Sequence, residues 1–361
     1  VCNGLSFDLS QGGVDGMTWI KGLYPGPWHV LTDTKAPRDG IQYQIMHSND
    51  SGVAWYPSSG LGISYYSPGC TNLGSYGTVN TDSQNYVLYS FASAPGYFDV
   101  VRYPGTGTPK SIPHTLSTKP GMIICKAVDA TESWYVYHQS IGATKFLTLN
   151  TAGEELSSTS VWNDTEPTAD NFTVGTNNAV NQASKEYVAY LFGNTEGLIK
   201  CGKFTGTGTP LQVDCGFEPQ WLMFKMSVYG GTGGDANYSY DWLIYDSKRP
   251  DSALRANKDN AQVGLADPAR FNSNGFSFPS GTGGDTNNLP GSEYVYVAIA
   301  APVVRSLTEA EFAQQRLNFE TYKNRKEVKC GEDALAARQA LIDKLREQGY
   351  TDAEIDAELG I

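Results

Sequence analysis

The sequence predicts an all-β protein of three tandem β-sandwich repeats, followed by a short α-helical C-terminal tail. Short runs rich in Val, Ile, Tyr, Trp and Phe alternate with clusters of Gly, Asn, Pro and Asp, which is typical of sandwiches. Similar segments also recur in the same order at a spacing of roughly a hundred residues. We therefore place repeats at 1–95, 96–195 and 196–303, and the tail at 304–361.

Three kinds of segment recur in each repeat. The first is an apolar run ending in lysine, written GMTWIK (16–21), GMIICK (121–126) and PQWLMFK (219–225). The second contains a tryptophan, in PWHVL (27–31), SWYVYH (133–138) and DWLIYD (241–246). The third is a tyrosine-rich run, in NYVLYSF (85–91), EYVAYLF (186–192) and EYVYVAI (293–299). Both alternating faces of EYVAYLF are apolar, so we expect this strand to lie inside its sandwich, partly covered on both sides.

A GTGTP turn links the repeats, at 105–109 and 206–210. A glycine-rich loop that binds phosphate needs a helix whose N-terminus faces the anion. Here Pro109 and Pro210 are followed by more strand-like sequence. The segment therefore predicts a tight turn, in which glycine supplies positive φ angles.

Aromatic residues offer two kinds of role. Trp28, Trp134 and Trp242 lie in apolar strands near Val or Ile, which favours packing in the core over the alternative of stacking on sugar rings. Exposed aromatic residues are expected instead in loop-like clusters. The candidates for surface recognition are Tyr65, Tyr66, Tyr238 and Tyr240.

The third repeat contains two GTGGD loops, and a calcium site through Asp235 and Asp285 is one interpretation of them. No spacing of several acidic ligands accompanies them, so we favour surface loops and predict no metal site. The six cysteines show no close pair and no placement shared between repeats. We expect them to be reduced, with a disulfide between Cys201 and Cys215 across a hairpin as the alternative.

No catalytic pattern is apparent among the four histidines or the carboxylate pairs, so the sequence predicts a protein that is not an enzyme and has no catalytic or cofactor-binding residues. Lysine and arginine number 26 against 38 acidic residues, giving a net charge of -12. That charge argues against nucleic acid as a partner. No run of 18 apolar residues occurs, so we expect no membrane insertion.

The tail after Leu307 is rich in charge and poor in glycine. Capping boxes at 308–311 and 351–354 predict helix starts, and Gly349 fits the end of a helix that begins near Glu332. An apolar stripe along that helix must be buried, either against the third sandwich or against another subunit. The residues that we assign to partner binding are Leu335, Leu341, Ile342 and Leu345.

The order of these segments resembles a repeat domain of virion structural proteins from tailed bacteriophages, particularly tail-fibre and appendage proteins of marine cyanophages. The resemblance rests on the GTGT turn, the Pro-to-Lys run at 120–126 and 219–225, the Trp-to-Tyr run at 134–137 and 242–245, the element at 172–175, and Tyr-Val-Ala-Tyr at 187–190. It covers residues 15–303 and fits best in the second repeat.

The resemblance implies a structural or host-attachment role in a tail fibre, appendage or capsid decoration, in a particle assembled in the bacterial cytoplasm. The expected partners are other virion proteins, further copies of the chain in a homo-oligomer, and glycans of the host surface. Two other functions stay open: a secreted adhesin or lectin, and a depolymerase whose sandwiches are accessory modules.

Overall fold

The computed structural model describes residues 15–39, 42–57, 62–66, 70–231, 240–265, 267–279, 287–301 and four positions of the tail. The chain divides into two compact units, residues 1–301 and residues 302–361. The prediction of an all-β protein is confirmed, because the described residues form antiparallel sheets with three four-residue helices. These helices are α1 (Gly77–Asn80), α2 (Thr159–Trp162) and α3 (Asn178–Asn181).

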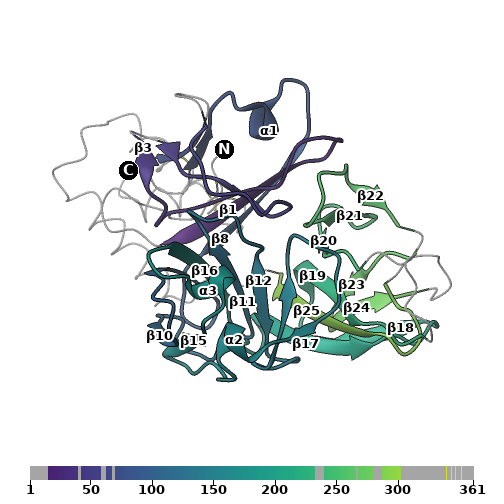
Figure 1. The fold of residues 1–361 in the computed structure, drawn as a ribbon. Coiled ribbons are helices and arrows are strands. Elements are labelled where there is room, and N and C mark those ends of the chain that lie inside the picture. Colours follow the sequence, from purple (N-terminus) through teal and green to yellow (C-terminus); the bar gives the residue numbers. More distant parts are fainter. Residues whose placement is uncertain are drawn as a thin grey trace. The chain divides into compact units, whose positions relative to one another are not determined.

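Three main sheets build the first unit, coloured purple to blue, teal and green in Figure 1. The first has the order β5-β2-β1-β8, the second β14-β13-β12-β11-β16-β9, and the third β17-β25-β19-β20-β21-β22. Smaller sheets accompany them, with the orders β3-β4, β6-β7, β10-β15 and β18-β24-β23.

The strands of the first segment are β1 (Gly16–Gly22), β2 (Val30–Asp33), β3 (Arg38–Asp39), β4 (Gln42–Tyr43), β5 (Met46–His47), β6 (Ile63–Tyr66), β7 (Cys70–Leu73) and β8 (Tyr86–Ala92). Those of the second are β9 (Phe98–Pro104), β10 (Lys110–Pro113), β11 (Met122–Ala127), β12 (Tyr135–His138), β13 (Lys145–Thr148), β14 (Leu156–Ser157), β15 (Asn171–Val174) and β16 (Glu186–Phe192). Those of the third are β17 (Ile199–Thr205), β18 (Leu211–Asp214), β19 (Pro219–Val228), β20 (Leu243–Asp246), β21 (Ser252–Arg255), β22 (Val263–Gly264), β23 (Arg270–Asn272), β24 (Gly275–Phe278) and β25 (Glu293–Ala300).

The pairing register of the three main sheets corresponds. Each apolar run that ends in lysine pairs with the tyrosine-rich strand of its own sheet. The lysine lies opposite a valine in all three, in the pairs Lys21 with Val87, Lys126 with Val188, and Lys225 with Val295. Equivalent positions in the three segments can therefore be read directly from backbone pairing.

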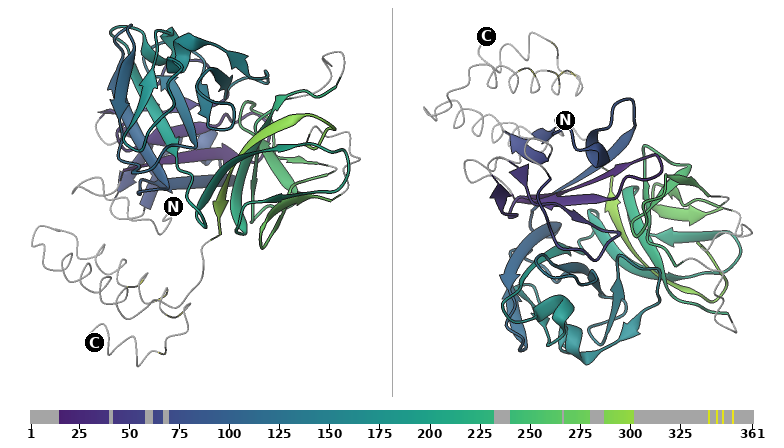
Figure 2. Two further views of the ribbon diagram at one scale, coloured as in Figure 1. Left: turned by 90° about the horizontal axis from the view of Figure 1, so that it is seen from below. Right: turned by 45° about the horizontal axis from the view of Figure 1, so that its top comes forward.

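Alternate residues of each central strand point to opposite faces of the sheet, and both faces are buried. One face of all three sheets contributes to a single shared core, which contains Met17, Met122 and Trp221. The other face packs in separate outer cores, around Ile20, Ile123 and Phe224 respectively. Both views in Figure 2 show the purple, teal and green sheets packed together. The boundaries at 95/96 and 195/196 stay predictions, because the three segments share this core.

The prediction that Trp28 packs in a core is wrong. Its side chain is 40% exposed, whereas Trp134 and Trp242 are completely buried. Backbone pairing shows that Val30, Tyr135 and Leu243 occupy the same position in the three sheets. The residue before each is therefore also equivalent, which places His29 at the position of Trp134 and Trp242. A shift of one residue in a strand moves a side chain to the other face, which is why Trp28 points outward.

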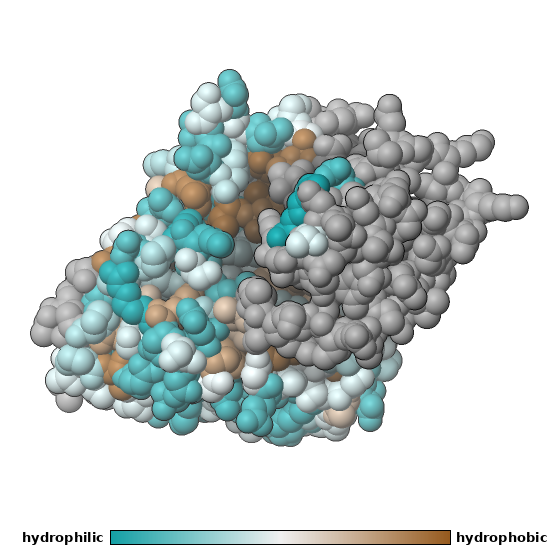
Figure 3. Space-filling view, turned by 180° about the vertical axis from the view of Figure 1, so that it is seen from behind, coloured by the Kyte–Doolittle hydropathy of each residue, from teal (hydrophilic) through white to brown (hydrophobic). Residues whose placement is uncertain are grey.

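The described surface is a mosaic of hydrophilic residues with smaller hydrophobic patches, as Figure 3 shows for one face. In the tail, Gln339, Asp343 and Arg346 have helical backbone geometry, and the amide of Gln339 donates to Asp343 Oδ1 at 2.9 Å. The four tail residues assigned to partner binding, Leu335, Leu341, Ile342 and Leu345, lie outside the described residues.

Candidate functional site

Hydrogen bonds from buried rings join the three sheets in a closed cycle. His29 Nε2 lies 2.9 Å from the carbonyl oxygen of Arg255 in the third segment. Trp134 Nε1 donates to the carbonyl oxygen of His47 in the first segment at 3.0 Å. Trp242 Nε1 donates to that of Thr148 in the second at 2.8 Å. Donors and acceptors both occupy equivalent positions, so each segment donates to one neighbour and accepts from the other.

The tautomers of the buried histidines follow from their partners. Trp19 Nε1 is a donor only and lies 2.8 Å from His29 Nδ1, so this nitrogen accepts and the proton lies on Nε2. His138 is arranged in the same way, because the Ser140 N–H donates to its Nδ1 and its Nε2 lies 3.0 Å from the carbonyl oxygen of Tyr296. Burial lowers the pKa of His29 to about 3 and that of His138 to about 4, so both rings are neutral at pH 7.

A second set of contacts uses the end of the tryptophan strand. Asp33 accepts a hydrogen bond from Tyr190 and forms an ion pair with Arg102 at 2.9 Å. Asp246, at the equivalent position of the third segment, accepts from Tyr89 at 2.8 Å. His138 occupies this position in the second segment. Each interface between sheets is thus fixed by a buried polar group.

The lysines that recur in the sequence are also buried, each at most 1% exposed. Lys126 Nζ donates to the carbonyl oxygens of Ala127 and Ala130, and Lys225 Nζ to those of Tyr240 and Thr151. Burial lowers the pKa of Lys225 to about 7, and that of Lys126 and of Lys21 to about 8. The polar groups that recur between segments therefore hold backbone carbonyls in place, which is a structural use.

A pocket lies on the first segment. Its volume is about 380 Å³ and three aromatic rings line it, those of Trp28, Trp55 and Tyr76. We call it the aromatic pocket. The remaining lining residues are Gly26, His47, Asp50, Gly52, Val53 and Thr78.

Ring contacts hold the walls of the aromatic pocket. Trp28 packs edge-on against His47 with centroids 4.8 Å apart, and Trp55 packs edge-on against Tyr76 at 5.5 Å. Trp55 is held by a backbone bridge to Ile45. Asp50 supplies a carboxylate, the strongest acceptor for hydroxyl groups in the lining. An exposed indole beside a carboxylate suits a ligand with an apolar face and several hydroxyl groups.

The residues predicted for surface recognition fall in different places. Tyr65 and Tyr66 lie in β6, but their side chains are outside the described residues, as is all of Tyr238. Tyr240 is partly buried against the outer core of the third segment. The structure does not bring the described members of this set together, and their role stays a prediction.

The structure bears on the calcium, disulfide and membrane predictions to different extents. Asp235 and Asp285, the calcium candidates, lie outside the described residues. Cys201 and Cys215 are buried free thiols, and burial raises the pKa of Cys215 to about 11. Across the described ranges, no group of three or more His, Cys, Asp or Glu side chains is placed to hold a metal ion. The same residues include no helix with the length and apolar character needed to cross a membrane.

Comparison with protein families matches residues 73–302 to a domain of unknown function, DUF7483. The chain belongs to the DUF7483 family. The DUF7483 match begins at the last residue of β7 and includes β8 and the second and third main sheets. Trp28 and Trp55 precede the DUF7483 segment, whereas Tyr76 lies within it. Neither a curated protein nor a solved structure matches the chain.

Proposed function

We propose that the protein is a non-enzymatic structural protein of a bacteriophage virion, in a tail fibre, appendage or capsid decoration, and that its aromatic pocket binds glycans of the host surface. The ordered motifs that resemble phage tail-fibre and appendage repeats support the virion role. One observation carries the attachment role: a 40% exposed tryptophan lines a pocket together with a second tryptophan, a tyrosine and a carboxylate.

The arrangement of the three sheets supports the same proposal. The recurring His, Trp and Lys side chains are buried and bind carbonyl oxygens, so the duplicated part of the chain serves rigidity. The aromatic pocket belongs to one segment only, because backbone pairing places Ser133 and Asp241 at the positions equivalent to Trp28. A rigid body that presents such a pocket fits the needs of an attachment protein.

Glycan binding tests the attachment role. We expect the purified chain to bind a subset of an array of bacterial surface glycans, and Trp28→Ala to reduce that binding about tenfold, since stacking on one aromatic ring and the associated burial are worth about 1.4 kcal/mol. Trp28→Phe retains an aromatic face and is expected to retain part of the affinity. Leu156→Ala, which removes another exposed apolar side chain, serves as the control and is expected to leave binding unchanged.

Particle labelling tests the virion role separately. Gold-labelled antibodies against the chain are expected to decorate purified particles at one defined place in electron micrographs. Particles without label, with the chain recovered only free in the lysate, would contradict the virion role. Absence of glycan binding by the labelled protein would contradict attachment alone.

A further inference from the structure

The tyrosine-rich strand of the first sheet differs from its two counterparts in its neighbours. β16 lies between β11 and β9, and β25 lies between β19 and β17. β8 pairs with β1 on one side, and across the described residues the first sheet ends at β8. Most of β8 is only partly buried, whereas β16 and β25 are buried along almost their whole length.

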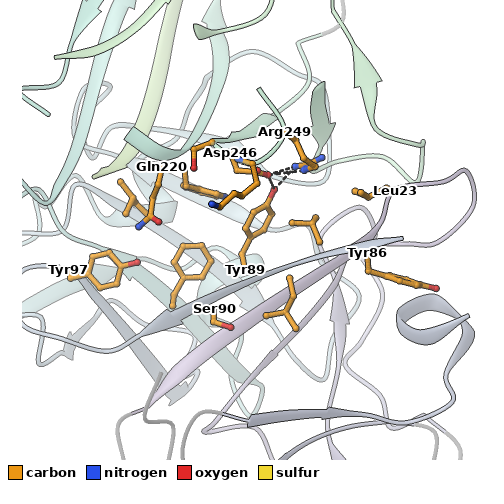
Figure 4. Close-up of a pocket in the computed structure, with 15 residues that line it drawn as sticks. Leu23, Tyr86, Tyr89, Ser90, Tyr97, Gln220, Asp246 and Arg249 are labelled. Atoms are coloured by element: carbon orange, nitrogen blue, oxygen red, sulfur yellow. Dashed lines mark hydrogen bonds and ion pairs between the residues drawn. The ribbon is translucent and has the colours of Figure 1, made fainter. Parts of the chain in front are cut away.

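A groove of about 470 Å³ runs along this edge. Six consecutive residues of β8, 86–91, line it. Successive side chains of a strand point to opposite faces, so a groove lined by all of them follows the hydrogen-bonding edge of the strand. Figure 4 shows it between β8 and the third segment, with Tyr89 reaching across to Asp246 and Arg249. This β8 groove is lined further by Leu23, Tyr97, Gln220, Trp221, Ser247, Lys248 and Ile299.

The far wall of the β8 groove is built from counterparts of the residues that hold β9. Asp33 pairs with Arg102 of β9, and Lys35 Nζ donates to the carbonyl oxygen of Val100 of β9 at 2.6 Å. Asp246 is equivalent to Asp33, because each lies opposite the residue four positions before the lysine of its segment. Lys248 follows Asp246 at the same spacing as Lys35 follows Asp33. The wall therefore carries the same two groups. Asp246 already forms an ion pair with Arg249 within the wall, so Lys248 is the group that can bind an added strand.

The strand β17 is held in the same manner. Gln139 Nε2 donates to the carbonyl oxygen of Cys201 of β17 at 2.6 Å. Gln139 follows His138 directly, as Ser247 follows Asp246 in the groove wall. Two of the three equivalent positions between sheets thus contain a seven-residue antiparallel strand, and the third contains the β8 groove.

We propose that the β8 groove binds an extended segment of a separate polypeptide, which adds as an antiparallel strand to β8. The two filled positions define its chemistry. β9 (FDVVRYP) and β17 (IKCGKFT) share an apolar residue at positions one and three, a basic residue at position five and an aromatic residue at position six. The proposal stands independently of the glycan and virion roles.

The side chains of β8 match this pattern. The sixth residue of β9, Tyr103, stacks on Tyr187 with centroids 5.3 Å apart, and that of β17, Phe204, stacks on Tyr294 at 4.6 Å. Tyr86 is the counterpart of these two tyrosines in β8. At the other end, Phe91 corresponds to Phe192, which lies opposite the first residue of β9.

The backbone of β8 supplies N–H and C=O groups that can form a ladder of hydrogen bonds with an added strand. The Ser93 N–H donates to the carbonyl oxygen of Asp15, and the Leu23 N–H to that of Asn85, which fixes the alternation along the strand. Odd-numbered residues of β8 therefore bond to β1, and the peptide groups of Tyr86 and Leu88 are directed toward the groove. Addition of a strand to such an edge gains affinity from main-chain hydrogen bonds and selectivity from alternate side chains.

A labelled peptide of residues 97–104 (YFDVVRYP) is the probe, added to the full chain and followed by fluorescence anisotropy. The Gly193 N–H donates to the carbonyl oxygen of Tyr97, and the Gly105 N–H to that of Lys185, so the N–H groups of Asp99, Val101 and Tyr103 face the paired strand. We expect saturable one-to-one binding, at least about tenfold weaker after N-methylation of Val101, since a ladder hydrogen bond is lost and a methyl group intrudes. N-methylation of Arg102, whose N–H faces away, is expected to have little effect.

Protein variants locate the peptide. Lys248→Ala is expected to weaken binding about two- to tenfold by removing a side-chain hydrogen bond to the peptide backbone. Lys200→Ala removes an exposed lysine elsewhere and is expected to leave binding unchanged. Three results would each overturn the proposal: no binding of the parent peptide at millimolar concentration, equal binding of a scrambled peptide or of the two methylated peptides, or unchanged affinity in Lys248→Ala.

Discussion

Trp134→Ala is expected to lower the free energy of unfolding by about 3–5 kcal/mol, the range for removing a buried tryptophan. Its ring is completely buried in the shared core and stacks on Tyr190 with centroids 6.4 Å apart. Its Nε1–H also donates to the carbonyl oxygens of His47 and Asp50 in the first segment. Truncation leaves both a cavity and two carbonyls without this donor. Chemical denaturation followed by circular dichroism measures the change.

Two further variants separate the causes. Trp134→Phe keeps much of the ring packing and removes the donor, so we expect a loss of about 1–3 kcal/mol. Trp28→Ala changes the tryptophan that recurs in the sequence but lies outside the core, and we expect a change within about 1 kcal/mol. Equal losses for Trp28→Ala and Trp134→Ala would contradict the register assignment that places His29, not Trp28, in the interface.

Acidification from pH 6.5 to pH 4 is expected to destabilise the protein steeply. His29 and His138 are neutral in the folded protein, with pKa values lowered by burial to about 3 and about 4, whereas an unfolded histidine titrates near 6.5. Between those values the unfolded chain binds more protons than the folded one, so stability falls as the pH falls. By pH 4, each ring lowers the free energy of unfolding by up to roughly 3 kcal/mol relative to pH 6.5. Protonation would also place a hydrogen on Nδ1, which accepts from Trp19 or Ser140.

Denaturation curves between pH 7 and pH 4 measure this effect. We expect His138→Gln, whose amide can both donate and accept, to be somewhat less stable at pH 7 but to have a flatter profile. His114 is not in an interface between sheets, and its ring accepts from the Leu116 N–H. We expect His114→Gln to keep most of the dependence of the unfolding free energy on pH. Parallel profiles for the wild-type protein and His138→Gln would show that the acid sensitivity has another origin.

The strand pattern was predictable because it depends on local composition and turns. The pairs of Lys21, Lys126 and Lys225 with valine confirm that the sequence motifs mark equivalent strands. The shared core was not predictable, since a strand such as EYVAYLF is apolar on both faces and does not indicate which face meets another sheet. Trp28 shows a related limit, because equivalence follows backbone pairing and not residue identity.

The candidate sites were hidden for a different reason. Trp28, Trp55 and Tyr76 are far apart in the sequence, and only the fold of the first segment brings them together. The β8 groove is equally non-local, because its walls come from residues 86–91 and 246–249. A signal in the sequence was the recurrence of YV-containing strands at 86, 187 and 294. Those at 187 and 294 pair with β9 and β17, whereas among the described residues the strand at 86 pairs only with β1.

The central claim is that the three sheets form one body around a shared core, locked by the cycle of ring hydrogen bonds. Native-state hydrogen exchange, followed by mass spectrometry at increasing denaturant, tests it most directly. The account predicts that the amides of β1, β11 and β19 converge on one opening free energy, equal to that of global unfolding. Opening of β1 with its sheet at clearly lower free energy, while β11 and β19 stay protected, would show that the segments are independent domains and contradict the account.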